Sequence, residues 1–246
     1  MLRFMMMFMA AASLLISSNQ TSFSQENHGT DASKHQTPVS YIENRGQWSP
    51  EVKFMAQLRG MNVWFTDKGL KYDVYTSRPA TSAEIKQEKS RLSRINREAA
   101  GKLVSGKPMQ RSGQVIEMEL VGASKLAVTG MEQQTSYRNY FIGRDKSKWQ
   151  TGVPVFSKLH SEEVYPGIDV VYSFQAGKPR YDFVVKPGAN PSSIALRFNG
   201  ANNVSVSSDK GITLSTKLGD MYNGNIYAYQ TINGREMQVP CEFTKQ

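Results

Sequence analysis

The chain has 246 residues, a formal net charge of +9, three histidines and a single cysteine, Cys241. One cysteine excludes an intrachain disulfide, and histidines without cysteines beside them exclude the usual zinc-site spacings. The length allows one large or two small domains. Cys241 is expected to be a buried apolar residue, because no histidine or helix N-terminus near it in the sequence would activate its thiol.

Residues 1–24 have the pattern of a secretory signal peptide. Arg3 provides a positive start, an apolar run covers residues 4–16, and residues 22–24 form a small-x-small cleavage site. The apolar run is short for a membrane span of about 20 residues, although an uncleaved anchor is an alternative. We therefore predict export to the cell surface or the extracellular space of a bacterium, with no membrane span after cleavage. Residues 25–38 are predicted to be a disordered polar leader.

The predicted fold is organised around a hairpin of residues 168–174 and 179–185. If Ala176 and Gly177 form the tight loop, Tyr172 lies opposite Tyr181, and side chains alternate between the two faces. One face then carries Ile168, Val170, Tyr172, Phe174, Tyr181, Phe183 and Val185. The other face carries Asp169, Val171, Ser173, Arg180, Asp182 and Val184. Because one register sorts nearly all apolar groups to one side, the hairpin is expected to cover a core with that side.

Strand patterns continue through most of residues 39–246, the predicted β-rich extracellular domain. Further strands are predicted at 52–58, 61–65, 70–75, 114–121, 127–131, 137–143, 153–156 and 159–164. Short strands separated by turns every ~8–12 residues are typical of antiparallel β architectures. We therefore predict an all-β sandwich or barrel-like fold of many short hairpins, as one domain or as two sub-domains.

A basic helix is predicted to interrupt this pattern at about residues 82–104. Ser82 is the expected N-cap, and apolar residues recur at helical spacing in a thin stripe. The helix is therefore expected outside the core, as an insertion between two strands. Residues 83–111 contain eight Lys or Arg against three Glu. A solvated charged face explains this excess, and a glycan or anionic cell-surface polymer is the alternative partner; an exported protein is not expected to meet nucleic acid.

No catalytic, cofactor-binding or metal-ligating residue is predicted, and no cofactor. The sequence has no P-loop, dinucleotide-binding or Gly-x-Ser-x-Gly motif. Asp169 and Asp182 are the candidate pair for a glycosidase, since the predicted register places them diagonally on one face with backbones ~7–8 Å apart. Arg180 flanks Asp182 on that face, so a surface ion pair is the preferred interpretation. His160 is expected to be a strand surface residue and not a general base.

Aromatic residues offer a second candidate site. Trp48, Trp64 and Trp149 are candidates for a platform that stacks on sugar rings, although most aromatic side chains are expected to pack in the core.

The last predicted unit is a hairpin around Asn233-Gly234, a dipeptide typical of two-residue turns. Its second strand, residues 236–243, is followed by three residues only. We expect an open strand edge there, a C-terminally truncated domain, and self-association through that edge.

Five motifs together resemble one family. They are YIENRGQW at 41–48, NYFIG at 139–143, WQTGVP at 149–154, YPGIDVVY at 165–172 and YDFVVKPG at 181–188. With these motifs, the chain resembles the uncharacterised N-terminal domain of large bacterial secreted proteins that carry SBBP-type β-propeller repeats. The resemblance covers about residues 39–243.

The resemblance implies a β-rich extracellular module, often followed by repeat domains and by a C-terminal sorting domain for type IX secretion. No catalytic residues are assigned in that family, so none is transferred. The expected function is a non-catalytic structural or interaction module of a secreted or cell-surface protein, N-terminal to missing repeat domains. A carbohydrate-binding or carbohydrate-cleaving β-sandwich is the alternative.

Overall fold

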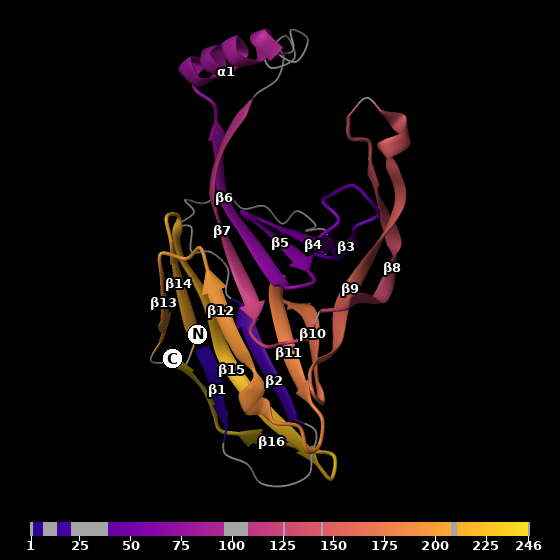
Figure 1. Ribbon diagram of the computed structural model, residues 1–246, viewed down its shortest axis with the longest axis vertical. Coiled ribbons are helices and arrows are strands. Elements are labelled where there is room, and N and C mark those ends of the chain that lie inside the picture. The colour runs from indigo at the N-terminus through magenta and orange to yellow at the C-terminus, as the bar shows by residue number, and fades with distance from the viewer. Residues whose placement is uncertain are drawn as a thin grey trace.

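The computed structural model describes residues 2–6, 14–20, 39–95, 108–124, 126–143, 145–207 and 211–245. The predicted disordered leader at 25–38 and the part of the predicted helix after residue 95 lie outside them. The described residues form a curled antiparallel sheet with the outline of a half-barrel, which confirms the predicted all-β class (Figure 1).

The elements follow one another in this order: β1 (Leu2–Met6), β2 (Leu14–Gln20), β3 (Tyr41–Glu43), β4 (Val52–Leu58), β5 (Met61–Thr66), β6 (Gly69–Pro79), α1 (Ser82–Ile95), β7 (Met109–Leu120), β8 (Val128–Tyr140), η1 (Lys146–Lys148), β9 (Gln150–Tyr165), β10 (Ile168–Gln175), β11 (Lys178–Val185), η2 (Pro191–Ser193), β12 (Ala195–Asn199), β13 (Asn203–Val206), β14 (Ile212–Thr216), β15 (Gly219–Ile232), β16 (Arg235–Val239) and β17 (Cys241–Lys245).

Strand pairing runs in two directions from β3, and these pairs are antiparallel. One direction leads through β4, β5, β6, β7, β12 and β1 to β17. The other leads through β9, β10, β11, β2, β15 and β14 to β13. β8 pairs with β9, and β16 pairs with β15. The two directions meet where Lys245 Nζ of β17 donates to the Val204 carbonyl of β13 at 3.0 Å, so the sheet curls round on itself.

The central hairpin, β10 and β11, has the predicted register. Tyr172 pairs with Tyr181, and Gln175 with Lys178 around the two-residue loop. The predicted core face is buried along its whole length except at Phe174, which is half-buried. The alternation of apolar and polar residues therefore predicted both the register and the buried face of this hairpin.

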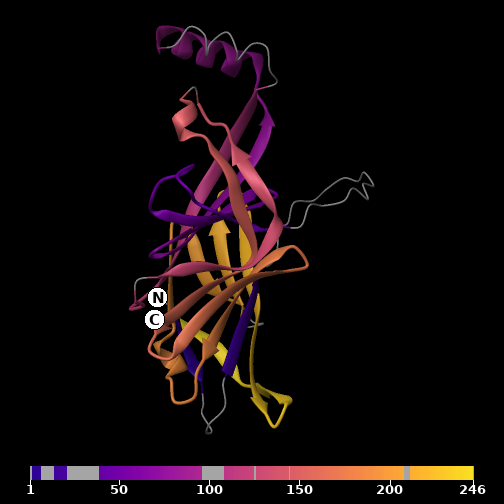
Figure 2. The ribbon, with the colours of Figure 1, turned by 90° about the vertical axis from the view of Figure 1, so that its right-hand side faces the viewer.

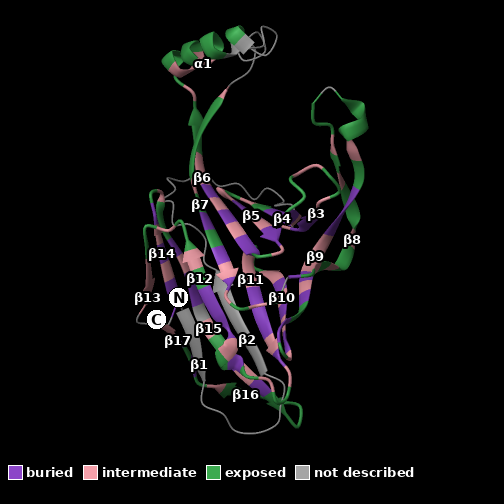
Figure 3. Ribbon diagram, viewed as in Figure 1, coloured by how far each residue is buried: buried purple, intermediate pink, exposed green. Residues whose placement is uncertain are grey.

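The core lies within the curl and is continuous from β3 to β17 (Figure 3). Near its centre, the Tyr41 ring stacks on Phe174 with centroids 4.4 Å apart and meets Phe65 edge-on at 5.3 Å. The Tyr41 hydroxyl donates to the Ser173 carbonyl at 2.9 Å, so its polar end is satisfied. Full burial of one such side chain contributes roughly 1.5–3 kcal/mol. Cys241 is buried in this core, as predicted.

Strands β8 and β9 are longer than predicted. The strands expected at 127–131 and 137–143 form one strand, β8, and those expected at 153–156 and 159–164 form β9. The β8–β9 pairing shifts register between Gln133 and Tyr137, just after Glu132 with its left-handed φ of 56°, and the β9–β10 pairing shifts around Glu163, with a φ of 50°. Bulges bend a strand without ending it, and they shift the alternation of its side chains. In β8, the irregular stretch at residues 132–136 was therefore wrongly interpreted as a break between two strands.

Two hairpin arms project beyond the body of the sheet (Figures 1 and 2). In the first arm, β6 and β7 stay paired from Gly69 opposite Glu119 to Pro79 opposite Met109, and α1 follows at the far end. The second arm consists of the far ends of β8 and β9 with η1 between them. Both arm ends are exposed (Figure 3). The helix is thus an external insertion between two strands, as predicted.

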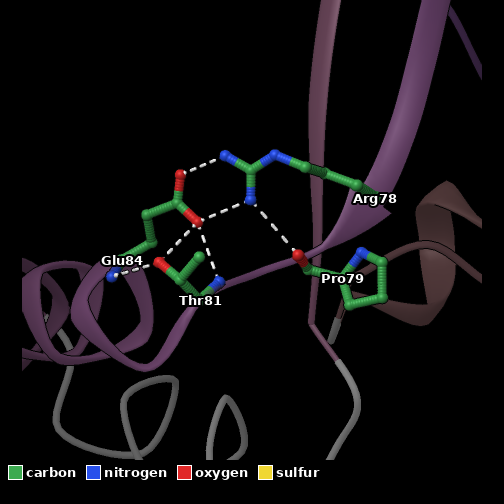
Figure 4. Close-up of polar contacts among 4 residues, drawn as sticks. All are labelled: Arg78, Pro79, Thr81 and Glu84. Atoms are coloured by element: carbon green, nitrogen blue, oxygen red, sulfur yellow. Dashed lines mark hydrogen bonds and ion pairs between the residues drawn. The ribbon is translucent and has the colours of Figure 1, made fainter.

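Thr81, and not Ser82 as predicted, caps helix α1 (Figure 4). Thr81 Oγ1 accepts a hydrogen bond from the Glu84 amide at 3.3 Å, and Glu84 Oε2 accepts from the Thr81 amide at 2.8 Å. This reciprocal pair is a capping box, and Ser82 is the first helical residue. Arg78 of β6 donates to both Glu84 carboxylate oxygens at 2.9 and 2.6 Å, so the helix start is fastened to its arm.

The predicted signal peptide contains two strands of the sheet. β1 pairs with β12 and β17, and β2 pairs with β11 and β15. The strand predicted at 236–243 is divided at Pro240 into β16 and β17, because proline has no N–H to donate to a ladder. One edge of β17 is paired with β1, so the edge expected to be open is covered by residues of the predicted signal peptide.

Candidate interaction site

Asp169 lies on the outer face of β10 and organises a bulge in β9. Its Oδ1 accepts from the Glu163 amide at 2.8 Å, at the residue with the left-handed φ. Lys186 Nζ lies 3.3 Å from the same oxygen, and His160 Nε2 lies 3.6 Å from Oδ2. Burial acts to raise the pKa of the Asp169 carboxyl. The Glu163 amide and the Lys186 ammonium outweigh burial and hold the pKa below its ordinary value.

Asp182 shares that face, but the predicted surface ion pair is largely buried. Arg180 Nε donates to Asp182 Oδ1 and Oδ2 at 2.8 and 2.9 Å, and Arg180 Nη1 donates to Gln175 at 3.1 Å. The Arg180 and Asp182 side chains are 24% and 10% exposed. The ion pair is therefore confirmed and its surface location is wrong. Asp182 is flanked by β10 and β2, where it pairs with Val171 and Ser17, and no local pattern indicates the second neighbour.

The chemistry open to this aspartate pair follows from these partners. A glycosidase needs one carboxylic acid that stays protonated near neutral pH, which requires a raised pKa. The pKa of Asp169 is lowered instead, and Asp182 is bound by a guanidinium. The contacts of both carboxylates thus suit the support of a bulge and of a strand pair.

The three tryptophans occupy two separate aromatic clusters. Trp48 packs edge-on against Trp64 and against Tyr140, with centroids 5.4 Å apart in both pairs. This cluster covers a small group of buried residues beside the main core. Trp149 instead contacts Phe141. The predicted three-tryptophan platform is therefore divided, and Trp149 alone belongs to an exposed site.

An aromatic tip closes the β8–β9 arm. We use this name for Tyr137, Phe141, Ile142 and Trp149, of which the first three are 60%, 59% and 56% exposed. The Phe141 and Trp149 rings meet edge-on with centroids 5.1 Å apart, and Trp149 Nε1 donates to the Gly143 carbonyl at 3.3 Å. Large apolar groups exposed together on a projecting arm are typical of an interaction site.

The turn that carries the aromatic tip is held by its own polar groups. Asp145 Oδ1 accepts from the hydroxyl and the amide of Ser147 at 2.6 and 3.1 Å, which caps η1. These two bonds, the hydroxyl first, lower the pKa of the Asp145 carboxyl. Asn139 Oδ1 accepts from the Gly152 amide at 2.9 Å and ties the two strands together below the turn. The tip is thus presented by a braced turn.

Cations accompany the aromatic rings of the tip. Lys146 Nζ lies 5.7 Å from the Trp149 ring centroid, within the range of a cation–π contact, and Lys148 follows on η1. Sequence reasoning singled out Trp149 and placed Phe141 and Ile142 in an ordinary strand. The polar residues 144–148 indicate a turn directly after that strand, but no local pattern shows that the turn projects beyond the sheet.

Helix α1 forms a second exposed feature, with a mild excess of positive charge. Within Ser82–Ile95, four basic residues face two glutamates. Glu84 is bound to Arg78 of the arm, and Glu88 to Arg91 at 2.5 Å. Lys86, Lys89 and Arg94 are exposed to solvent, so the described part of the helix presents a cationic surface.

Metal-binding groups, membrane-spanning helices and cavities are the other candidate site types among the described residues. Within the described ranges, no group of three or more His, Cys, Asp or Glu side chains is placed to hold a metal ion. None of the helices in this part of the chain has the length and apolarity to cross a membrane. A cavity of about 390 Å³ lies beside Asp67, Glu119 and Ser124. Glu119 is bound there by Arg197 at 3.1 Å, and the cavity opens widely to solvent.

The fold and this site define an all-β protein with one main core, a small second cluster beside it, and two exposed arms. A family model, described as a domain of unknown function (DUF7948), matches residues 41–246. The chain therefore belongs to the DUF7948 family. A search of curated proteins and a search of solved structures each found no match.

Proposed function

We propose that this protein is a non-catalytic interaction module of a secreted or cell-surface bacterial protein. The observation that carries the proposal is the aromatic tip, where Phe141 and Ile142 are more than half exposed at the end of a braced arm. Exposed aromatic groups held by a rigid turn bind a partner with little loss of conformational entropy. Lys146 and Lys148 add positive charge beside the rings.

A binding role agrees with the contacts of the two aspartates. Asp169 is held by Lys186, and Asp182 by Arg180. These contacts support the bulge in β9 and the strand β11, and the lowered pKa of Asp169 does not suit a proton donor to a leaving group.

The export part of the proposal is supported by the sequence of residues 1–24. The five motifs that resemble the N-terminal domain of SBBP-repeat proteins support a place before repeat domains in a type IX secreted protein. In that context the arms would contact a neighbouring domain or a polymer of the cell surface.

A carbohydrate ligand is the second candidate, favoured by the Phe141–Trp149 pair beside Lys146. Aromatic faces stack on sugar rings, and a nearby ammonium suits acidic sugars. A glycan array and isolated bacterial envelopes serve as the two probes. Saturable binding to the array supports a carbohydrate ligand, whereas binding to envelopes alone supports another surface partner.

The test is a pair of variants of the full chain. The double variant Phe141→Ala/Trp149→Ala should weaken binding at least ~10-fold, because aromatic anchors contribute about 2 kcal/mol or more when they are central to an interface. Met237→Ala is the matched control, since Met237 is a large exposed apolar residue of the sheet body. Equal losses in both variants, or unchanged binding in the double variant, would contradict the assignment of the site to the tip.

A further inference from the structure

Strand β2 lies between β11 and β15 and completes the sheet there. It is antiparallel to both neighbours, with six residue pairs on the β11 side and six on the β15 side. Asp182 and Tyr227 both pair with Ser17, and Phe183 and Ala228 both pair with Ile16. β2 therefore fills a slot one strand wide between β11 and β15, in which its backbone pairs with both neighbours.

The slot joins two parts of the sheet. Among the strands that the structure describes, backbone ladders connect β13–β17 with the rest of the sheet only through β1 and β2. Both of these strands come from residues 1–24, which have the pattern of a cleaved signal peptide. Cleavage after Ser24 would therefore leave β11 and β15 with unpaired N–H and C=O groups along facing edges.

A buried hydrogen bond fixes the width of the slot. Asn223 Nδ2 of β15 donates to the Tyr181 hydroxyl of β11 at 2.7 Å, and both residues are buried. Direct pairing of β11 with β15 would bring the two strands to about 4.8 Å from each other, half of their separation across an intervening strand. The bond between Asn223 and Tyr181 would then lose its geometry. The interior of the protein thus favours an open slot over a closed one.

The lining of the slot sets the chemistry of its occupant. Opposite Phe183, Val185 and Ala228, all buried, the occupant needs apolar residues. At the other end, the polar residues Asn223 of β15 and Arg180 of β11 lie opposite Gln20 and Asn19 of β2. Polar residues of the occupant suit this end, because buried polar groups such as Asn223 are normally hydrogen-bonded. The sequence of β2, LLISSNQ, has this order, with apolar residues first and polar residues after them.

We propose that the slot between β11 and β15 is a strand-acceptor site. In the processed protein it takes an extended segment of another polypeptide, antiparallel to both edges, apolar in its first half and polar in its second. Residues 14–20 occupy the same place in the unprocessed chain. Main-chain hydrogen bonds to both edges hold the segment, and the buried side chains at the slot select its pattern. This inference rests on the proposed export, because removal of the signal peptide opens the slot.

The experiment uses the full chain with a specific protease site introduced between residues 25 and 38. The protein is folded, cut, and mixed with an excess of a fluorescent peptide with the sequence of residues 14–20. The excess keeps the slot filled throughout, so unfolding of an emptied domain does not obscure the result. A peptide with the Ser17→Pro substitution is the control, because proline removes a donor from the centre of the strand.

We expect the labelled peptide to replace the cut fragment and the proline peptide to compete at least ~10-fold less well. Amide exchange should show β11 and β15 protected with the peptide present. A second sample is cut and freed of the fragment with no peptide added. Protection of both strands in that sample would overturn the proposal, since the sheet would have closed. A fragment that excess peptide cannot displace would overturn it too, because residues 14–20 would then be a permanent part of the fold. Export is tested separately, by the N-terminus of the protein found outside the cell.

Discussion

Replacement of Asp182 by asparagine tests whether its ion pair is buried. In the full chain, Asp182→Asn keeps the shape of the side chain and removes the charge that Arg180 Nε contacts at 2.8 and 2.9 Å. A hydrogen bond to a charged group contributes about 1.5–3 kcal/mol, and breaking a fully buried pair costs ~3–5 kcal/mol. Because Arg180 keeps some contact with water, we expect a loss of about 2 kcal/mol in the free energy of unfolding, measured by urea denaturation.

The exposed pair of Arg197 and Glu119 provides the matched control. Its side chains are 45% and 41% exposed, and such pairs contribute about 0–1 kcal/mol. Glu119→Gln should therefore change the stability by less than ~1 kcal/mol. A double-mutant cycle of Asp182→Asn with Arg180→Gln should give a coupling of at least ~1 kcal/mol. Equal effects of Asp182→Asn and Glu119→Gln would refute the argument from burial.

Three further predictions follow from the backbone and the arms. Gly200→Ala should lower the free energy of unfolding by roughly 2–4 kcal/mol, since φ is +84° and the new methyl group would overlap a β7 carbonyl oxygen. Gly122→Ala, at φ +74° with open space around it, should lower it by ~1–2 kcal/mol. Urea denaturation compares the two variants, and equal losses would contradict the overlap. The pKa of Glu84 is lowered to about 2, mainly by its hydrogen bonds with Arg78. The contribution of Glu84 to the stability of the folded protein is therefore present above the ordinary carboxyl pKa and is lost as pH falls through about 2. NMR titration of Glu84 should show that midpoint, and Arg78→Gln should raise it. Replacement of residues 80–108 by a short glycine linker should leave the sheet's circular dichroism and cooperative unfolding unchanged, and failure to fold would show that the helix supports the core.

Local patterns predicted much of the sheet. The register of the central hairpin followed from the alternation around Ala176-Gly177, and the strand Val52–Leu58 has the predicted bounds. The pairing outward from Asn233-Gly234 is also confirmed, because Ile232 pairs with Arg235. In each case the information lies within a few residues of a turn, where side-chain period and turn chemistry agree.

Features that depend on distant strands could not be predicted. Asp182 is buried because strands from far along the chain lie beside it, and no local pattern shows this. The irregular pairing after the left-handed Glu132 made the long strand β8 look like two short ones, since a non-glycine residue gives no sign of positive φ. The aromatic tip was missed because Phe141 and Ile142 continue a strand pattern past its end.

The N-terminus of the protein outside the cell tests the central claim most directly. Intact-mass measurement of the chain recovered from the medium or the cell surface of the producing bacterium identifies the residue at which the mature chain begins. We predict a mature chain that begins at Gln25, as expected for an exported module whose strand slot has been opened. A surface-recovered chain that still contains residues 2–20, or recovery of the protein from the cytoplasm alone, would contradict the account.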